Sequence, residues 1–227
     1  MDTILIVVPC YNSAKYIAET IASIKAQTSD CWKCVIVDDG STDKTLEIVN
    51  ELISDDDRFS VIQQQHGGVA KARNYGISSF DCKYVLPLDS DDMLTPIAIE
   101  TFLDTFKKNP DASLLVPMIK RFSNFSEPVI QKRQWKGYET LKMRCTNPNS
   151  SCFKRSDWER IGGYRSETMY EDWEFWIRLL YDNDNVINIP EVLIEYRVHP
   201  DSRWFKAVKR HGKEVQIIRK LNKNIYG

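Results

Sequence analysis

The chain has 227 residues, of which 42% are hydrophobic and 28% charged, and its formal net charge is −1. These values are ordinary for a globular protein with a sizeable core, and they exclude a nucleic-acid clamp that depends on overall positive charge. No stretch reaches the roughly 20 apolar residues of a membrane-spanning helix, and the early run "ILIVVP" resembles a strand more than a signal peptide. The chain has six scattered cysteines, and the pair Cys31 and Cys34 lacks the two further ligands that a zinc site would need. Scattered cysteines of this kind fit a reducing compartment. We therefore expect a cytoplasmic protein.

The first half of the chain alternates short apolar runs with amphipathic segments. In chain order we expect a strand at 3–8, a helix at 14–26 capped by Asn12-Ser13, a strand at 34–37, a helix at 44–52, a strand at 59–63, a helix from 67 to 77, a strand at 83–88, a helix that Thr95 caps and Pro96 begins, and a strand at 112–119. Strands that alternate with helices are typical of a parallel sheet with helices on both faces. The sequence thus predicts an α/β fold with a Rossmann-like, mostly parallel sheet.

The alternation fades in the second half. There we expect, in order, a variable irregular loop at 121–136, a short strand near 150–153, a turn at Gly162-Gly163, a helix from about Glu171 to Tyr181, one or two strands at 186–197, and a helical tail from Arg203. The tail carries eight basic residues and one acidic residue. Such a balance favours contact with an anionic surface, although a solvated terminal helix would explain it equally well.

Polar residues follow four of the predicted strands, at Tyr11-Asn12, Asp38-Asp39, His66-Gly67 and Asp89 to Asp92. The carboxyl ends of parallel strands meet at one edge of a sheet, and ligands of such folds bind beyond that edge. We therefore expect these four clusters to line one binding site.

The stretch "LPLDSDD" places three carboxylates within four residues behind a buried strand. Carboxylate oxygens are preferred ligands of Mg²⁺ and Mn²⁺, and a cation would relieve the mutual repulsion of Asp89 and Asp91. The alternative is an acidic turn that only caps the next helix.

Other candidate residues have two interpretations each. Asp38 and Asp39 could accept hydrogen bonds from a nucleotide or only cap a turn, and Arg73 lies on a Gly-Gly-initiated helix whose backbone amides could meet a phosphate. Asp172 beside Trp173 suits deprotonation of a sugar hydroxyl, whereas the tryptophans of this segment could equally be core residues. His199 is either structural or a phosphate or metal contact.

Six motifs in this order and spacing resemble the family 2 inverting glycosyltransferases of the bacterial cell-surface polysaccharide type: "VVPCYN", "VDDGSTDKT", "GGVAKARNYGI", "LPLDSDD", "GGY" and "YEDWEFWIRL". The resemblance runs from about residue 3 to 202 and implies the GT-A fold with Mn²⁺ or Mg²⁺ as cofactor. The roles it implies are nucleotide binding for Pro9, Tyr11, Asn12, Asp38, Asp39, Arg73 and Asp89, metal binding for Asp91 and His199, acceptor or sugar contact for Glu171 and Trp173, and general-base catalysis for Asp172.

The resemblance also implies an organisation and partners. Residues 1–120 would bind the nucleotide sugar, residues 121–202 would form the acceptor-binding and catalytic half of the same domain, and residues 203–227 would be a basic C-terminal helix. The expected partners are a nucleotide-sugar donor, with UDP favoured, and a saccharide or lipid-linked acceptor, with the basic tail touching the inner face of the membrane. The processive synthases carry a Gln-x-x-Arg-Trp element, whereas here no Gln precedes Arg203-Trp204. We therefore expect transfer of single sugars. A nucleotidyltransferase and a non-catalytic sugar-nucleotide-binding module remain alternatives, and the oligomeric state stays open.

Overall fold

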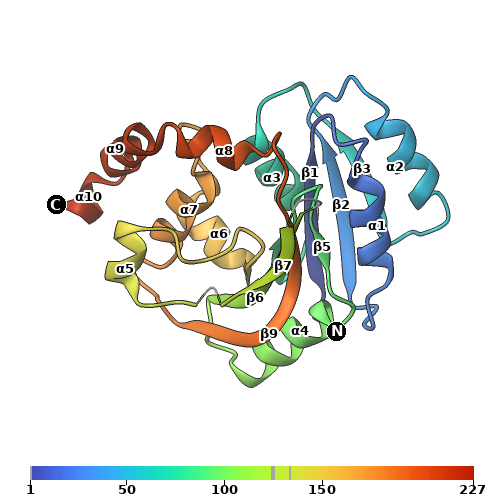
Figure 1. Ribbon diagram of the computed structural model, residues 1–227. Helices are drawn as coiled ribbons and strands as arrows, with labels where there is room; N and C mark the ends of the chain where they lie inside the picture. Colours follow the sequence, from blue (N-terminus) through green and yellow to red (C-terminus); the bar gives the residue numbers. More distant parts are fainter. Residues whose placement is uncertain (1, 124–125, 133) are drawn as a thin grey trace.

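A computed structural model of the chain describes residues 2–123, 126–132 and 134–227. Its strands are β1 (Ile4–Cys10), β2 (Trp32–Asp38), β3 (Phe59–Gln63), β4 (Tyr84–Pro87), β5 (Met93–Leu94), β6 (Leu114–Ser123), β7 (Ser126–Gln131), β8 (Cys152–Lys154) and β9 (Val186–Arg197). They form one curled sheet in the order β3-β2-β1-β4-β8-β6-β9-β5, and β7 pairs with β6 (Figure 1). The expected parallel arrangement is confirmed for β3, β2, β1 and β4, whereas β8 runs antiparallel to both of its neighbours.

The helices are α1 (Ile17–Lys25), α2 (Thr45–Ile53), α3 (Val69–Ser78), α4 (Ala98–Lys108), α5 (Tyr138–Met143), α6 (Arg155–Ile161), α7 (Glu171–Leu179), α8 (Arg203–Val208), α9 (His211–Leu221) and α10 (Lys223–Tyr226). They cover the two faces of the sheet, so that two separate hydrophobic cores form. Helices α1, α2 and α4 pack on one face, and α3, α5, α7 and α9 pack on the other. The expected layered α/β architecture is therefore confirmed.

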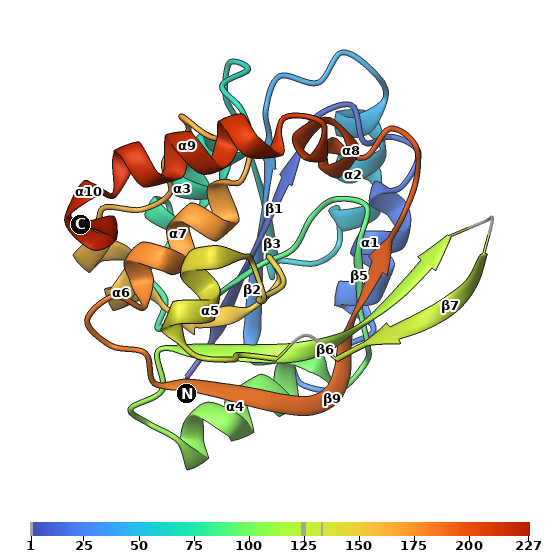
Figure 2. The ribbon, with the colours of Figure 1, turned by 60° about the vertical axis from the view of Figure 1, so that its left-hand side comes forward.

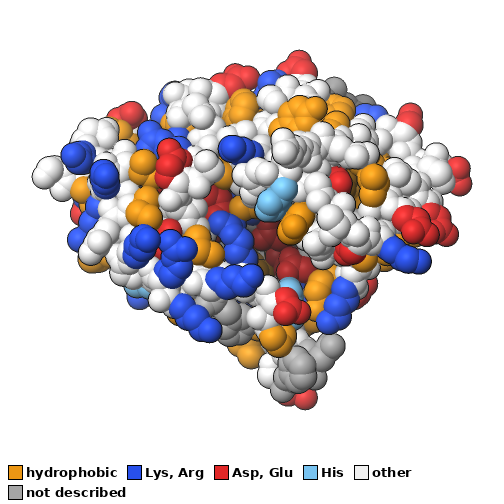
Figure 3. Space-filling view, turned by 90° about the horizontal axis from the view of Figure 1, so that it is seen from above, with side chains coloured by type: hydrophobic (Ala, Val, Ile, Leu, Met, Phe, Trp, Pro, Cys, Tyr) orange, Lys and Arg blue, Asp and Glu red, His pale blue; other side chains and the backbone are white. Residues whose placement is uncertain are grey.

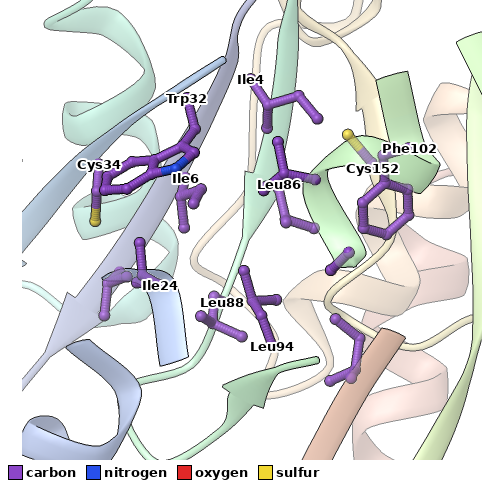
Figure 4. Packing of buried hydrophobic residues seen from close by; sticks show 14 of the residues in the cluster. Ile4, Ile6, Ile24, Trp32, Cys34, Leu86, Leu88, Leu94, Phe102 and Cys152 are labelled. Atoms are coloured by element: carbon purple, nitrogen blue, oxygen red, sulfur yellow. The ribbon is translucent and has the colours of Figure 1, made fainter. Parts of the chain in front are cut away.

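Strand β1 supplies both cores because successive side chains of a strand point to opposite faces. Ile4, Ile6 and Val8 face one core, where Figure 4 shows Ile4 and Ile6 among Trp32 and Leu86, while the intervening residues face the other core. Strand β1 is therefore buried on both faces, as its continuous apolar run predicts.

Helix α3 approaches the sheet unusually closely at Gly76. A Cβ atom added there would lie 2.7 Å from Val7 Cγ1 and 2.9 Å from Val37 Cγ2. Such distances lie inside van der Waals contact, so the backbone of α3 can reach β1 and β2 only because residue 76 has no side chain. This close packing brings Arg73, one turn earlier, over the end of the sheet.

Several local predictions were wrong. Helix α4 begins at Ala98 and has no side-chain cap, because Thr95 Oγ1 donates instead to Val192 O (3.1 Å) and residues 93–94 pair with β9 as β5. The expected cap of α1 by Asn12-Ser13 is likewise absent.

The second half contains more regular structure than predicted. Of the predicted irregular loop at 121–136, residues 121–123 and 126–131 are strand, because β6 extends through Ser123 and pairs with β7, and the pair projects from the molecule (Figure 2). Residues 132 and 134–136 are irregular, as predicted, and residues 124–125 and 133 lie outside the described part. Helices α5 and α6 were not predicted, and the tail is divided into three helices rather than one. Among the described residues, no helix has the length and hydropathy needed to cross a membrane.

Candidate active site

The polar clusters that follow β1, β2, β3 and β4 meet at one rim, as expected from the parallel pairing of these strands. Seen from above this rim, the molecule is hollowed, with acidic side chains on the floor and Lys and Arg side chains along one side (Figure 3). The predicted site residues lie on the strand ends and loops of this rim and on helices α3 and α7, and their contacts are described in turn below.

The floor contains a group of three carboxylates, Asp89, Asp91 and Asp92, and one oxygen from each lies within 4.8 Å of those of the other two. Burial, followed by the charge of Asp89, raises the pKa of Asp91 above its usual value. Burial and the other two carboxylates raise the pKa of Asp92 further. The donors are hard oxygen atoms, and their negative charge is incompletely balanced, so the group fits a divalent cation such as Mg²⁺ or Mn²⁺. The group contains Asp91, the ligand implied by the resemblance, and Asp89, which the motif paired with it for a cation, together with Asp92, which had not been predicted as a ligand.

The loop that carries these carboxylates is held from two sides. Thr20 Oγ1 donates to the carbonyl oxygens of Ser90 (3.0 Å) and Asp92 (2.8 Å). From β9, the backbone amide of Arg197 donates to Asp92 Oδ1 (2.9 Å), and its guanidinium Nε donates to the carbonyl of Asp91 (3.0 Å). The carboxylates are thereby kept close together despite their repulsion.

His199 lies beside the carboxylate group, as predicted. Its Nε2 is 2.8 Å from Asp91 Oδ2, and its ring contacts Tyr16 with 4.8 Å between the ring centroids. The arrangement places an imidazole next to the predicted metal ligand, either to hold the carboxylate in position or to share a cation with it.

Asp39 is almost fully buried and is the centre of a hydrogen-bond cluster. Its carboxylate accepts hydrogen bonds from the Gln64 side chain (2.6 Å) and from the backbone amides of Gly67 and Gly68 (2.8 Å each), and His66 Nδ1 lies 2.9 Å from Oδ2. Four partners use most of the accepting capacity of a carboxylate. In this structure Asp39 therefore orders the loop between β3 and α3, and the predicted contact with a nucleotide base would have to compete with these partners.

The other residues predicted for the nucleotide lie around this loop. Tyr11 is 47% exposed and stacks on the His66 ring with 4.1 Å between the centroids, which gives a flat aromatic surface at the rim. Asn12 adopts a positive φ of 52° and its Oδ1 accepts from the Thr42 amide (2.8 Å). Pro9 is buried in β1, and Asp38 accepts from the Ser41 amide (3.3 Å).

Arg73 connects the group of three carboxylates to α7, the helix that carries the predicted base Asp172. Its guanidinium is 2% exposed; Nη2 lies 2.7 Å from Asp89 Oδ1, and Nη1 lies 2.8 Å from Glu171 Oε1. Asp89 also accepts from Asn149 Nδ2 (3.2 Å). Since the guanidinium is occupied by two carboxylates, Arg73 acts here as a bridge between β4 and α7.

Asp172 stands in the first turn of α7, and its Oδ1 accepts from the Trp173 amide (2.8 Å). Burial, followed by the adjacent charge of Glu171, raises the pKa of Asp172 to about 6, while Arg73 and Arg203 oppose this shift. A carboxyl group with this pKa is deprotonated at neutral pH and is more basic than an ordinary aspartate, which suits a general base.

Two predicted acceptor contacts are contradicted by burial. Glu171 is 4% exposed and pairs with Arg73 and Arg203, and Trp173 is 3% exposed, with its Nε1 donating to Leu141 O (2.6 Å). Burial alone would raise the pKa of Glu171, but Arg203 and Arg73 outweigh it and lower this pKa. Glu171 is thus a buried anion held by two guanidinium groups, and Trp173 is a core residue.

Sequence reasoning missed Gln64, Asn149 and the pairing of Arg203 with Glu171. Gln64 and Asn149 belong to no motif, and their polar atoms reach the site only because the chain folds back over 25 and 60 residues. Arg203 was noticed as part of a basic tail and in the comparison with the processive synthases, but it was not predicted to pair with Glu171.

A family model described as "Glycosyl transferase family 2" matches residues 5–156. The UDP-Gal:alpha-D-GlcNAc-diphosphoundecaprenol beta-1,3-galactosyltransferase of Escherichia coli is 27% identical over 219 residues, which are 92% of this chain and 77% of that protein. Other curated relatives are longer: two are 37% identical over 116 and 124 residues, and the chain spans only 38% and 13% of their lengths.

Two proteins of solved structure share the fold. Staphylococcus aureus TarS, residues 1–349 in complex with UDP-GlcNAc, has a TM-score of 0.73 at 22% identity, and the match covers 90% of this chain and 61% of the TarS chain. The mannosyltransferase PcManGT of Pyrobaculum calidifontis, in complex with GDP-Man and Mn²⁺, has a TM-score of 0.73 at 21% identity and covers 95% and 64%. The GT-A fold expected from the sequence is confirmed.

Proposed function

The chain belongs to glycosyl transferase family 2 and is a glycosyltransferase, and we propose that it transfers a single sugar from a nucleoside-diphosphate sugar to an acceptor hydroxyl with inversion at the anomeric carbon. The observation that carries the proposal is the Arg73 bridge, which ties the carboxylate group of Asp89 to the helix of Asp172. The bridge joins the two groups that such a transfer requires: carboxylates that can hold a cation beside a diphosphate, and a base that can deprotonate a hydroxyl. Family membership removes the support for a nucleotidyltransferase.

In the proposed mechanism Asp172 accepts the proton of the acceptor hydroxyl while that oxygen attacks the anomeric carbon from the face opposite the leaving group. General-base catalysis of this kind contributes about 10²–10⁴-fold. Asp91, with Asp89, Asp92 and His199 around it, would hold Mn²⁺ or Mg²⁺, which stabilises the negative charge of a leaving diphosphate when bound. The exposed Tyr11 ring would offer a stacking surface to the nucleotide base.

We assign the donor to residues 1–120, with UDP favoured, and the acceptor to residues 121–202, the half that contains Asp172. The acceptor is a saccharide or a lipid-linked saccharide. A relative whose name includes a diphosphoundecaprenol acceptor is consistent with the second choice. The basic tail would then contact an anionic membrane surface through exposed lysines and arginines, while Arg203 and Arg210 are paired internally with Glu171 and Glu214.

The test of the function is a panel of UDP- and GDP-sugars with Mn²⁺ or Mg²⁺, scored by thermal shift and by release of the nucleoside diphosphate. We expect Asp172→Asn to bind the donor normally and to lose at least 100-fold in transfer. The matched control is Asp182→Asn, which removes an exposed carboxylate near the far end of α7. Near-normal transfer by Asp172→Asn would refute the assignment of the base. Binding without any turnover by the wild type would indicate a sugar-nucleotide-binding module.

The membrane contact has a separate test. Sedimentation with vesicles of neutral lipid, with and without anionic lipid, should show binding that requires the anionic lipid and weakens with salt. Equal sedimentation in both cases would remove this part of the proposal.

A further inference from the structure

The C-terminal helices pack directly against the segment that carries Asp172. Figures 1 and 2 show α8 and α9 beside α7, and side-chain contacts join these elements. Glu214 of α9 is 1% exposed, and its Oε2 accepts hydrogen bonds from Thr168 Oγ1 (2.9 Å) and from the Met169 amide (2.8 Å). A buried carboxylate of the tail therefore fixes the irregular residues that lead into α7.

Helix α8 makes a second connection through Arg203. Its Nη1 and Nη2 donate to Glu171 Oε1 (2.8 Å) and Oε2 (2.6 Å), and Nη2 also donates to the Met169 carbonyl (3.1 Å). This two-pronged geometry is specific to a guanidinium and holds both the backbone before α7 and the side chain next to Asp172.

Further contacts join the rest of the tail to the same region. Asn222 Nδ2 donates to Glu174 Oε1 (3.1 Å), Arg165 Nη1 donates to the Leu221 carbonyl (3.2 Å), and the Tyr170 hydroxyl lies 3.2 Å from His211 Nδ1. The tail thus touches the chain both before and after Asp172. Residues 162–170 form no helix or strand, so their position depends on such partners.

We propose that residues 203–222 act as an internal brace for the general base, and that Arg203 and Glu214 are positioning residues that set the place of Asp172 for proton removal. The inference rests on the proposed role of Asp172 as the base. It gives the basic tail a function within the molecule, in addition to any contact that its exposed lysines make. A misplacement of about 1 Å in a catalytic group can lower a rate by 10²-fold. The brace therefore affects the rate even if it prevents only a small displacement of Asp172.

The charges around Asp172 predict a second effect. The charged and titratable groups that act on it are Glu171 on its own helix, Arg73 on α3, Arg203 on α8, and the nearby Tyr164 and Tyr170. Arg203 lowers the pKa of Asp172, so loss of this guanidinium should raise that pKa and move the acidic limb of the rate profile to higher pH.

The experiment compares Arg203→Gln, Arg203→Lys and the control Lys213→Gln in the full chain. Lys213 lies in the same tail but is exposed and makes none of the contacts described above, so in an assay without membranes its replacement removes the same charge without breaking a contact of the brace. We expect Arg203→Gln to lower kcat about ten- to hundredfold with donor KM changed less than about threefold, and to move the acidic limb to higher pH. Arg203→Lys should recover part of kcat and most of the pH profile, and Lys213→Gln should match the wild type.

Hydrogen exchange gives a readout that does not depend on activity. Amides of residues 166–176 should exchange faster in Arg203→Gln than in the wild type or in Lys213→Gln. Unchanged kcat and unchanged exchange in Arg203→Gln would overturn the brace, and so would equal losses in Arg203→Gln and Lys213→Gln. If Arg203→Gln does not fold, the same comparison of kcat, pH profile and exchange is made with Arg203→Lys, and wild-type values there would also overturn it. Absence of transfer by the wild type would instead count against the proposed function.

Discussion

Replacement of Asp172, the proposed general base, should stabilise this protein while it abolishes transfer. Folding takes the Asp172 carboxylate from water into a largely enclosed place beside Glu171, and its pKa rises from 3.8 to about 6. The charged form is therefore less stable in the folded chain than in the unfolded chain. Asp172→Asn removes the charge, and the Asn side-chain oxygen can still accept from the Trp173 amide, which donates to Asp172 now (2.8 Å).

The magnitude follows from the shift of the pKa. One pKa unit corresponds to about 1.4 kcal/mol, so a shift of about two units costs the wild type about 3 kcal/mol of unfolding free energy at pH 7. Between pH 3.8 and about 6 the folded state holds a proton that the unfolded state has released. The free energy of unfolding of the wild type therefore falls as the pH rises through that window. Above about pH 6 the destabilisation by the charged Asp172 stays nearly constant. The Asn variant has no such dependence.

The assay is urea unfolding of the wild type, Asp172→Asn and the control Asp182→Asn at pH 4, 5, 6 and 7. We expect the advantage of Asp172→Asn over the wild type to be about 0.5 kcal/mol at pH 4, about 1.5 kcal/mol at pH 5, and about 3 kcal/mol at pH 7. Asp182→Asn should show no such trend. The reasoning is refuted if Asp172→Asn is no more stable than the wild type at pH 7, or if its advantage is the same at every pH.

Three other predictions address the site and the fold. With a base of pKa about 6, kcat should fall about tenfold between pH 7 and pH 5; a flat profile in folded enzyme would contradict the assignment. Gly76→Ala should lower the free energy of unfolding by about 1–3 kcal/mol, because the added Cβ would overlap Val7. The control Gly212→Ala, with open space around it, should be neutral or slightly stabilising in the same urea titration. Equal effects of the two substitutions would argue against close packing of α3. Asp91→Asn should weaken Mn²⁺-dependent binding of a nucleoside diphosphate by on the order of tenfold or more in calorimetry, and unchanged binding would remove Asp91 from the cation site.

The sequence by itself determined strands β1 to β4 and the edge of the sheet at which the site lies. Short continuous apolar runs such as 4–8 and 34–37, bounded by polar residues and alternating with helices, are typical of strands covered on both faces, and parallel strands bring their carboxyl ends together. The gathering of Tyr11, Asp39 and Asp89 at one rim follows from these local patterns. The carboxylate group also follows, because its three members lie within four residues of one another.

Only the tertiary structure decided which partner each polar side chain has. Arg73 is 98 residues from Glu171, and Glu214 is 46 residues from Thr168, so no local pattern could pair them. The same holds for Trp173, whose sequence environment fits a sugar contact or a core position, and which the packing of α7 against Leu141 places in the core. Periodicity reports which face of an element is apolar, but the partner of a charged group depends on the relative placement of whole elements. For this reason the tail, expected as a basic surface helix, is found in contact with the segment that carries Asp172.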